Sequence, residues 1–244
     1  MDIPFFMNCL LFHTTPPFEL APNDPKLAHI DGVLKTANGG EIFAGTLNGK
    51  LWICRFIRRS DGGAELVPVR EIANPDRLGV CLAVAFARPQ IAQRILFEAA
   101  CFGVDKLVFY AATKGEADYA KSGLYTKGEY LKWLEKGAEQ SCSTYIPEFS
   151  TAANLEKAAE ELLAGVSADA LKIAPDVYEA EAGLPDALAD RQNRTVCALL
   201  GGERGLTAAD RNALRSRGFK LVSLGRRVLR TDSAVIATLA GCVF

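Results

Sequence analysis

The sequence predicts a small N-terminal β-barrel followed by an α/β domain built on a parallel sheet. Short apolar runs separated by tight glycine turns fill the first half of the chain and are typical of a small barrel. Residues 78–110 follow a strand, helix, strand pattern, which is a βαβ unit and implies a parallel sheet. Residues 199–235 hold two copies of one arrangement, in which an apolar run, a glycine turn and a polar capping residue precede a helix.

The composition excludes several classes of protein. The chain has 244 residues, of which 49% are hydrophobic and 23% charged, as in an ordinary globular protein. Its longest apolar runs are too short to span a bilayer, and the N-terminus lacks the basic region of a secretory signal. The seven cysteines lie far apart and only two histidines accompany them, so we expect core cysteines, no disulfide framework and no metal. A cytoplasmic protein without a membrane partner is indicated.

The barrel is expected over residues 1–73. Apolar runs at 41–47 and 51–57 flank Asn48-Gly49, which is a strong hairpin signal because both central residues of such a turn need positive φ. Residues 64–72 follow a second glycine turn and form the next predicted strand. Short strands joined by such turns favour a barrel over a layered α/β fold.

The α/β domain is expected over residues 78–244. Its first unit combines a buried strand at 78–86, a helix at 90–101 that ends before Gly103, and a strand at 104–110. The linker at 74–76 would separate it from the barrel.

Four further elements are expected along the α/β domain. The pattern predicts helices over 127–140 and 151–165, a strand over 170–174 and an apolar C-terminal helix over 233–244. The strand at 170–174 would lead into a third loop at Pro175-Asp176, beside the two glycine loops.

The glycine loops at strand ends predict one ligand pocket. Ligands of open α/β sheets lie beyond the carboxyl ends of the strands, and glycines let the backbone approach a ligand closely. The alternative is that these glycines are simple turns between strand and helix. Thr207 has the spacing of a helix cap, with Asp210 in the first turn, so we assign this pair a structural role.

The charge distribution is uneven although the net charge is only -1. Residues 203–232 carry eight basic and three acidic side chains, whereas residues 151–190 carry nine acidic and two basic ones. Such a basic segment can hold phosphates. The alternative interpretation, which is the more common one for charge runs, is a solvated helix face without a partner.

Residues 224–234 read Leu-Gly-Arg-Arg-Val-Leu-Arg-Thr-Asp-Ser-Ala and resemble the L-G-x-R-I-L-R-T-E-T-A loop of the SPOUT RNA methyltransferases. The resemblance is to the branch that methylates uridine N3 of 16S ribosomal RNA. Residues 200–205 are similar to its I-G-P-E-G-G loop, with Gly202 in place of the proline and Arg204 in place of a glycine. Residues 139–141, Glu-Gln-Ser, match the end of a family helix, although Ser143 stands where arginine is usual.

Residues 7–12 and 28–35 resemble the PUA-like domain that precedes the methyltransferase in this family. The family usually has arginine where Cys9 and Lys35 stand. Residues 112–116 replace a Ser-Glu-Arg-Ser-like segment that would face RNA. The resemblance implies a PUA-like β-barrel and a SPOUT α/β domain with a C-terminal trefoil knot.

The resemblance also implies a cofactor and partners. The cofactor would be S-adenosylmethionine, and the partners would be 16S rRNA or the small ribosomal subunit and a second copy of the chain in a homodimer. Cofactor contacts would come from the two glycine loops, at Leu200, Gly201, Gly202, Glu203, Gly205, Leu224, Gly225, Val228 and Leu229. RNA phosphates would be contacted by Lys35, Arg226 and Arg227.

Arg230 is the catalytic candidate that the resemblance implies. Uridine N3 must lose a proton before it accepts a methyl group, and a fixed guanidinium would stabilise the resulting negative charge. The alternative for Arg230 is an ion pair with Asp232 or Glu203. Asp232 has the chemistry of a general base, but an acid at a helix start is more often a cap.

Two rival functions stay open. Changes at Gly202, Arg204, Ser143 and residues 112–116 favour an RNA-binding or ribosome-assembly module whose methyltransferase pocket has decayed. The second rival is a SPOUT methyltransferase that acts on another RNA. Cofactor binding separates the decayed module from either enzyme, and modification mapping separates the two enzymes.

Overall fold

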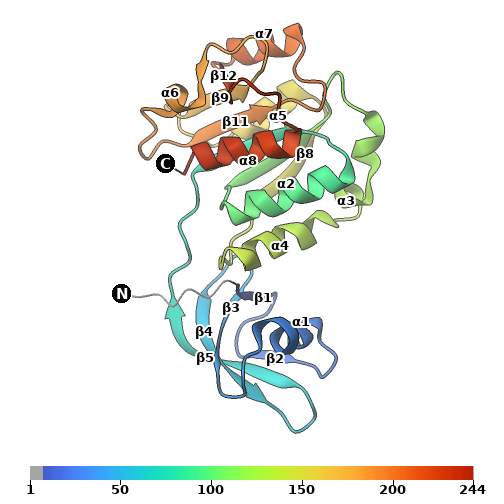
Figure 1. Ribbon diagram of the computed structural model, residues 1–244, viewed down its shortest axis with the longest axis vertical. Helices are drawn as coiled ribbons and strands as arrows, with labels where there is room; N and C mark the ends of the chain where they lie inside the picture. The colour runs from blue at the N-terminus through green and yellow to red at the C-terminus, as the bar shows by residue number, and fades with distance from the viewer. Residues whose placement is uncertain (1–7, 244) are drawn as a thin grey trace. The chain divides into compact units, whose positions relative to one another are not determined.

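The computed structural model describes residues 8–243 and divides into two units (Figure 1). One unit comprises Met1–Asp76 with Glu135–Ile146, and the other comprises Arg77–Leu134 with Pro147–Phe244. Met7, which belongs to the pattern that resembles the PUA-like domain, lies outside the described residues. The domain limits 1–73 and 78–244 stay predictions.

The first unit is a five-stranded mixed sheet that curls into a near-closed barrel. β1 runs parallel to β3, and the other strand pairs are antiparallel. The strands in sheet order are β1 (Leu10–Phe12), β3 (Glu41–Thr46), β4 (Leu51–Arg58), β5 (Ala64–Ile72) and β2 (Phe18–Leu20). A short helix α1 (Pro25–His29), capped by the Asp24 side chain, continues into a π-helical turn over Ile30–Leu34.

The hairpin between β3 and β4 is confirmed, but its turn differs from the expected one. Asn48 has a φ of 54°, whereas Gly49 does not adopt positive φ. The N–H of Thr46 donates to the carbonyl of Lys50, which closes a three-residue loop instead of a two-residue one. A three-residue hairpin loop needs only one left-handed residue, and Asn tolerates that conformation.

The second unit is a seven-stranded sheet in which all strand pairs are parallel. The strands in sheet order are β10 (Ala182–Gly183), β12 (Lys220–Ser223), β9 (Leu171–Pro175), β11 (Val196–Leu200), β6 (Val80–Ala85), β7 (Lys106–Tyr110) and β8 (Glu148–Ala152). Along the chain, β7 and β8 therefore add to one side of β6, and the later strands lie on its other side. The expected βαβ unit is confirmed, and the trefoil knot stays a prediction.

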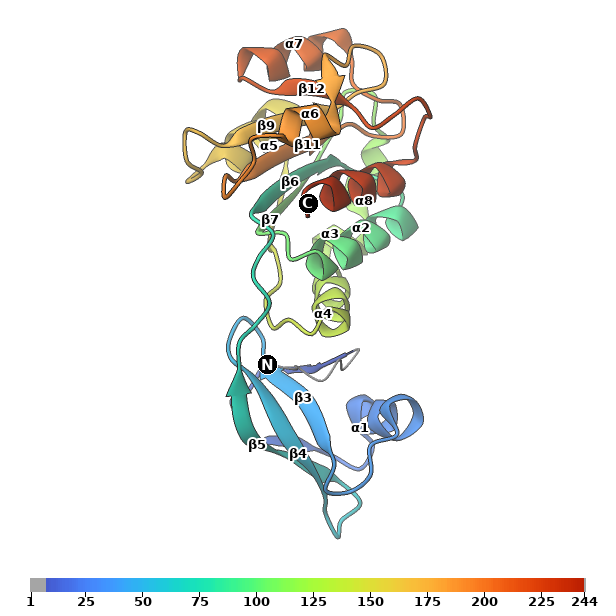
Figure 2. The ribbon, with the colours of Figure 1, turned by 60° about the vertical axis from the view of Figure 1, so that its left-hand side comes forward.

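Helices cover both faces of the parallel sheet (Figure 2). α5 (Leu155–Leu163) packs on β6, β7 and β8 and against α7 (Ala208–Ser216). α2 (Pro89–Cys101) packs against α8 (Thr231–Gly241). The remaining helical elements are η2 (Ala117–Lys121), α3 (Gly123–Thr126), α4 (Tyr130–Gln140) and α6 (Leu184–Leu188).

Two predicted helices are present but begin later than expected. The helix expected over 151–165 begins only at Leu155, because the Asn154 side chain accepts from the Lys157 N–H and caps it there. Residues 148–152 form β8 instead, paired in parallel with β7. The helix expected over 127–140 begins at Tyr130, after Gly128 with a φ of +73°.

The cysteines are core residues, as expected. All seven are thiols; five are buried, and Cys101 and Cys142 are half-buried. Among the described residues, no helix has both the length and the apolar character to cross a membrane.

Candidate functional site

Three loops meet beyond the carboxyl ends of β9, β11 and β12 and enclose a cavity of about 170 Å³. The loop after β9 contributes residues 176–178, the loop after β11 contributes 200–206, and the loop after β12 contributes 224–225 and 227–229. The cavity therefore lies at the sheet edge where open α/β proteins bind their ligands.

The structure brings all the predicted cofactor residues into this one cavity. Its lining includes Leu200, Gly201, Gly202, Glu203, Gly205, Leu224, Gly225, Val228 and Leu229. The predicted third loop is also present, through Asp176, although the sequence did not indicate Val177 or Tyr178. Arg204 lines the same cavity with an exposed side chain.

Backbone conformation explains why glycines occupy the two loops. Gly205 and Gly225 have φ values of +66° and +113°, which side-chain-bearing residues rarely adopt. A Cβ on Gly201 would lie 3.1 Å from the backbone carbon of Gly205, so the loop would have to shift by a few tenths of an ångström to admit a larger residue. A Cβ on Gly225 would meet nothing within 4 Å, which leaves the space above this glycine free.

Two structural contacts fix the frame of the first glycine loop. The expected cap at Thr207 is confirmed as a capping box: Thr207 Oγ1 accepts from the Asp210 N–H, and Asp210 Oδ2 accepts from the Thr207 N–H. The hydroxyl of buried Tyr110 donates to the Leu200 carbonyl at 3.0 Å, at the end of β11. Burial raises the pKa of Tyr110, so this hydroxyl stays a donor.

A second hollow, of about 520 Å³, adjoins the cavity. The two share Gly202, Glu203 and residues 228–229. Arg230 lines this hollow and not the cavity itself, and its side chain is 67% exposed. The structure thus places the catalytic candidate next to the cofactor residues, in a separate space.

Arg230 takes part in the ion pair that the sequence offered as its alternative role. Its Nε lies 3.4 Å from Asp232 Oδ1, whereas Glu203 pairs with Arg88 at 3.6 Å. Asp232 is 7% exposed in its side chain, and its Oδ2 accepts from Arg94 at 3.2 Å. Asp232 Oδ1 accepts no hydrogen bond within the described structure, so this side chain is an ion-pair partner and not the expected helix cap.

The residues predicted to contact RNA belong to different units. Arg226 and Arg227 are exposed on the loop after β12, and Arg227 also lines the cavity. Lys35 is exposed in the barrel unit, where it ends the π-helical turn with a φ of 52°. Ser143, at the position of a family arginine, is buried and accepts from the Tyr145 N–H.

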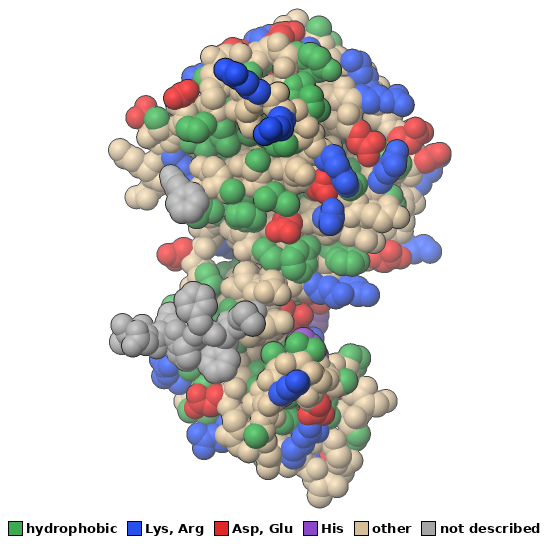
Figure 3. Space-filling model, viewed as in Figure 1, with side chains coloured by type: hydrophobic (Ala, Val, Ile, Leu, Met, Phe, Trp, Pro, Cys, Tyr) green, Lys and Arg blue, Asp and Glu red, His purple; other side chains and the backbone are tan. Residues whose placement is uncertain are grey.

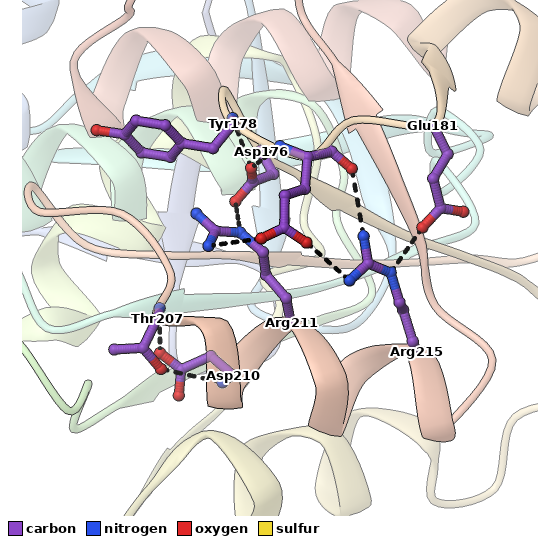
Figure 4. A network of polar contacts seen from close by, with 8 residues as sticks. Asp176, Tyr178, Glu181, Thr207, Asp210, Arg211 and Arg215 are labelled. Atoms are coloured by element: carbon purple, nitrogen blue, oxygen red, sulfur yellow. Dashed lines mark hydrogen bonds and ion pairs between the residues drawn. The ribbon is translucent and has the colours of Figure 1, made fainter.

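The basic segment is not one continuous surface. Figure 3 shows Lys and Arg side chains interspersed with acidic ones over the visible face of the α/β unit. Arg211 and Arg215, which the sequence grouped with the phosphate-binding candidates, point from α7 to acidic residues of the loop after β9 (Figure 4). Carboxylates thus engage both guanidinium groups, and a phosphate role for these two arginines stays a prediction.

We call residues 176–181 the acidic loop. Arg211 Nε donates to Asp176 Oδ2 at 2.8 Å, and both side chains are less than a tenth exposed. Asp176 Oδ1 accepts from the N–H groups of Tyr178 and Glu179 at 2.7 and 2.8 Å. Burial opposes ionisation of Asp176, but these backbone hydrogen bonds and Arg211 together hold its pKa below the usual range.

Sequence reasoning missed this network, although a signal was present. Arg211 and Arg215 are one helical turn apart and so share a face of α7. The acidic residues at 176, 179 and 181 lie in a short loop. The opposite charges of the two segments indicated that they pair with each other, although neither segment alone shows which residues meet.

Comparisons with known proteins agree with this architecture. A model of the RNA methyltransferase domain family matches residues 74–242. The chain is 27% identical over 226 residues to the ribosomal RNA small subunit methyltransferase E of Treponema pallidum, covering 91% of this chain and 83% of that protein. It is 25% identical over 217 residues to the ribosomal RNA small subunit methyltransferase E 1 of Borreliella burgdorferi, covering 88% of each.

A similar solved structure is that of a ribosomal RNA small subunit methyltransferase E from Neisseria gonorrhoeae, bound to S-adenosyl methionine. The TM-score is 0.75 at 19% identity, over 96% of both chains. This likeness covers the barrel as well as the parallel sheet and shows a shared fold.

Proposed function

This chain belongs to the RNA methyltransferase family, and on that premise we propose that it methylates uridine N3 in 16S ribosomal RNA with S-adenosylmethionine as methyl donor. The single observation that carries the proposal is the cavity formed by three strand-end loops, which contains every residue expected to hold the cofactor. The names of the relatives from Treponema and Borreliella supply the substrate class.

The residues of the cavity suit S-adenosylmethionine. The ligand carries no phosphate, so it needs an apolar slot and backbone contacts instead of a phosphate-binding loop. The side chains of Leu200, Leu224, Val228 and Leu229 line the cavity and would form the slot for adenine. The backbone of Gly201 and Gly225 would contact the edge of the ring. When bound, the cofactor supplies a methyl group on a sulfonium centre.

The chain's own contribution to the reaction is positioning and charge stabilisation. The hollow beside the cavity would hold the acceptor nucleotide, because the two spaces share Val228 and Leu229. Arg230 lines that hollow, and its guanidinium would stabilise the negative charge that develops on the uracil ring as N3 loses its proton. Asp232 would keep Arg230 oriented through their ion pair.

The partners follow from the same proposal. Lys35, Arg226 and Arg227 would contact phosphates of 16S rRNA or of the small ribosomal subunit. The protein would act in the cytoplasm as a homodimer. Salt titrations of RNA binding test the arginines when the wild type is compared with variants that lack Arg226 or Arg227. Each lost phosphate contact reduces the slope of log affinity against log salt concentration by about one.

The role of Arg230 is tested with a matched arginine. Arg94 also pairs with Asp232, and its side chain is equally exposed at 67%, but it does not line the hollow. We expect Arg230→Gln to lower kcat on 16S rRNA by about 10²–10³-fold and Arg94→Gln by much less. Equal losses in both variants would reduce Arg230 to an ion-pair partner.

The cofactor assignment is tested by calorimetric titration with S-adenosylmethionine, with and without 16S rRNA. Saturable binding, followed by mapping of a methyl group to uridine N3, is the expected result. A methyl group on another RNA would favour the second methyltransferase interpretation.

A module with a decayed pocket is the remaining candidate, favoured by Gly202 and the exposed Arg204 at the cavity. It predicts RNA binding without cofactor binding under either condition of the titration.

A further inference from the structure

We infer that Tyr178 forms an aromatic wall of the cofactor cavity that stacks on the ligand, and that Arg211 and Arg215 are positioning residues that hold it there. The inference rests on the proposed function, because it assigns the ligand of that cavity a contact outside the glycine loops. It concerns the acidic loop, which forms the third side of the cavity through Asp176, Val177 and Tyr178.

The acidic loop has no apolar anchor of its own at its tip. Val177 is 56% exposed and Tyr178 is 74% exposed, so neither side chain is held by burial in the core. A loop of this kind would move freely unless polar contacts fixed it. The N–H groups of Asp176 and Glu181 hold the two ends of the loop to carbonyls of β12. Between these ends, the loop is fixed by the side-chain hydrogen bonds and ion pairs of Asp176, Glu179 and Glu181.

Those contacts form a continuous clamp onto α7 (Figure 4). Asp176 folds the loop locally through the N–H groups of Tyr178 and Glu179, and Arg211 binds its other oxygen. Glu179 bridges the two arginines, with Oε1 3.3 Å from Arg211 Nη1 and Oε2 2.9 Å from Arg215 Nη1. Arg215 Nε also pairs with Glu181 Oε1 at 2.8 Å.

The clamp orients the aromatic ring of Tyr178. The Arg211 guanidinium lies 5.2 Å from the ring centroid, within the range of a cation–π contact. A Cβ built on Gly205 would lie 3.8 Å from Tyr178 Cε2, so the ring stands beside the first glycine loop. An exposed, oriented aromatic ring at a cavity is suited to stacking on a flat heterocycle such as adenine.

The decisive experiment compares Tyr178→Ala with Tyr178→Phe. The phenylalanine variant keeps the ring and removes only the hydroxyl, so it is the matched control. We expect Tyr178→Ala to weaken S-adenosylmethionine binding about tenfold in calorimetric titration, and Tyr178→Phe to bind like the wild type. In steady-state kinetics, KM for the cofactor should rise in the alanine variant while kcat at saturation stays the same.

The clamp is tested on Arg215, which is 36% exposed and is expected to tolerate substitution. Arg215→Gln should speed amide hydrogen exchange across residues 176–181 in the free protein and raise the cofactor Kd severalfold, and Arg215→Lys should recover part of both effects. Arg217→Gln is the matched control, because Arg217 follows the same helix and its guanidinium bonds to the Ala213 carbonyl instead of the loop.

The possible failures are distinguishable. If the wild type binds no S-adenosylmethionine with or without RNA, the proposed function fails and this inference falls with it. If the wild type binds but Tyr178→Ala binds equally well, the inference alone is overturned. If Arg215→Gln shows faster exchange but unchanged cofactor affinity, the clamp is purely structural and the inference is also overturned.

Discussion

The cavity has walls of two kinds, and they are built by different physics. The glycine loops after β11 and β12 take their shape from local backbone constraints, as the positive φ values of Gly205 and Gly225 show. The acidic loop after β9 takes its shape from α7, through an ion pair between Asp176 and Arg211, 35 residues apart in the chain. One kind of wall is specified within a few residues, and the other exists only once the domain has folded.

The difference sets what each wall tolerates. A glycine loop fails when a side chain meets the backbone or enters the cavity. The acidic loop depends on a buried charge pair, whose desolvation is costly and whose single members cannot be removed without leaving the other charge unpaired. The predictions below separate the two kinds of wall.

The largest effect is expected from Arg211→Leu. It leaves the Asp176 carboxylate, which is 2% exposed, without its cation. We expect the free energy of unfolding to fall by about 3–5 kcal/mol, measured by urea denaturation. The double variant Asp176→Asn/Arg211→Leu should recover most of this loss, because the substituted amide is uncharged and keeps an oxygen that can accept from Tyr178 and Glu179. Equal losses in the single and double variants would show that Arg211 acts through packing alone.

Gly225→Trp should reduce cofactor affinity at least about a hundredfold, by filling the open space above the glycine, and calorimetric titration measures it. Gly128→Trp is the matched control. Gly128 also has a positive φ, of +73°, and open space within 4 Å, but it does not line the cavity. A similar loss in both variants would trace the effect to backbone strain, and the glycine loop would lose its assigned role.

The same contrast explains what the sequence predicted correctly. Asn48, Gly103 and Thr207 act on their immediate neighbours, so the hairpin, the end of α2 and the start of α7 were predictable. The cavity was predictable because parallel strands share one edge, which brings Leu200 and Leu224 together.

Strand β8 and the pairing of arginines with carboxylates were missed because they depend on long-range contacts. Residues 148–152 have no strong strand pattern and become a strand by pairing with β7 at the sheet edge. Charge composition showed that segments 151–190 and 203–232 are opposite in sign, but only the fold reveals which arginine meets which carboxylate.

A smaller effect is expected from Thr207→Ala, which removes the side chain that caps α7. The Asp210 N–H then loses its acceptor, and we expect a loss of about 1 kcal/mol in unfolding free energy. Thr207→Ser should be nearly neutral, since it keeps the hydroxyl. Because α7 carries both arginines of the clamp, hydrogen exchange should rise in the acidic loop as well as in the first turn of α7. Exchange confined to the helix would mean that the cap does not support the acidic loop.

The smallest effect is the acid response of the acidic loop. The pKa of Asp176 is lowered in the folded state, so its contribution to stability is present above the unfolded value of about 3.9 and is lost as pH falls through the folded value. Between those two pH values the wild type should lose stability more steeply than Asp176→Asn, which carries no titrating group at this position. Urea denaturation at a series of acidic pH values gives both slopes. Parallel slopes would assign the acid sensitivity to other carboxylates, and the acidic loop would then be held by hydrogen bonds that do not depend on the charge of Asp176.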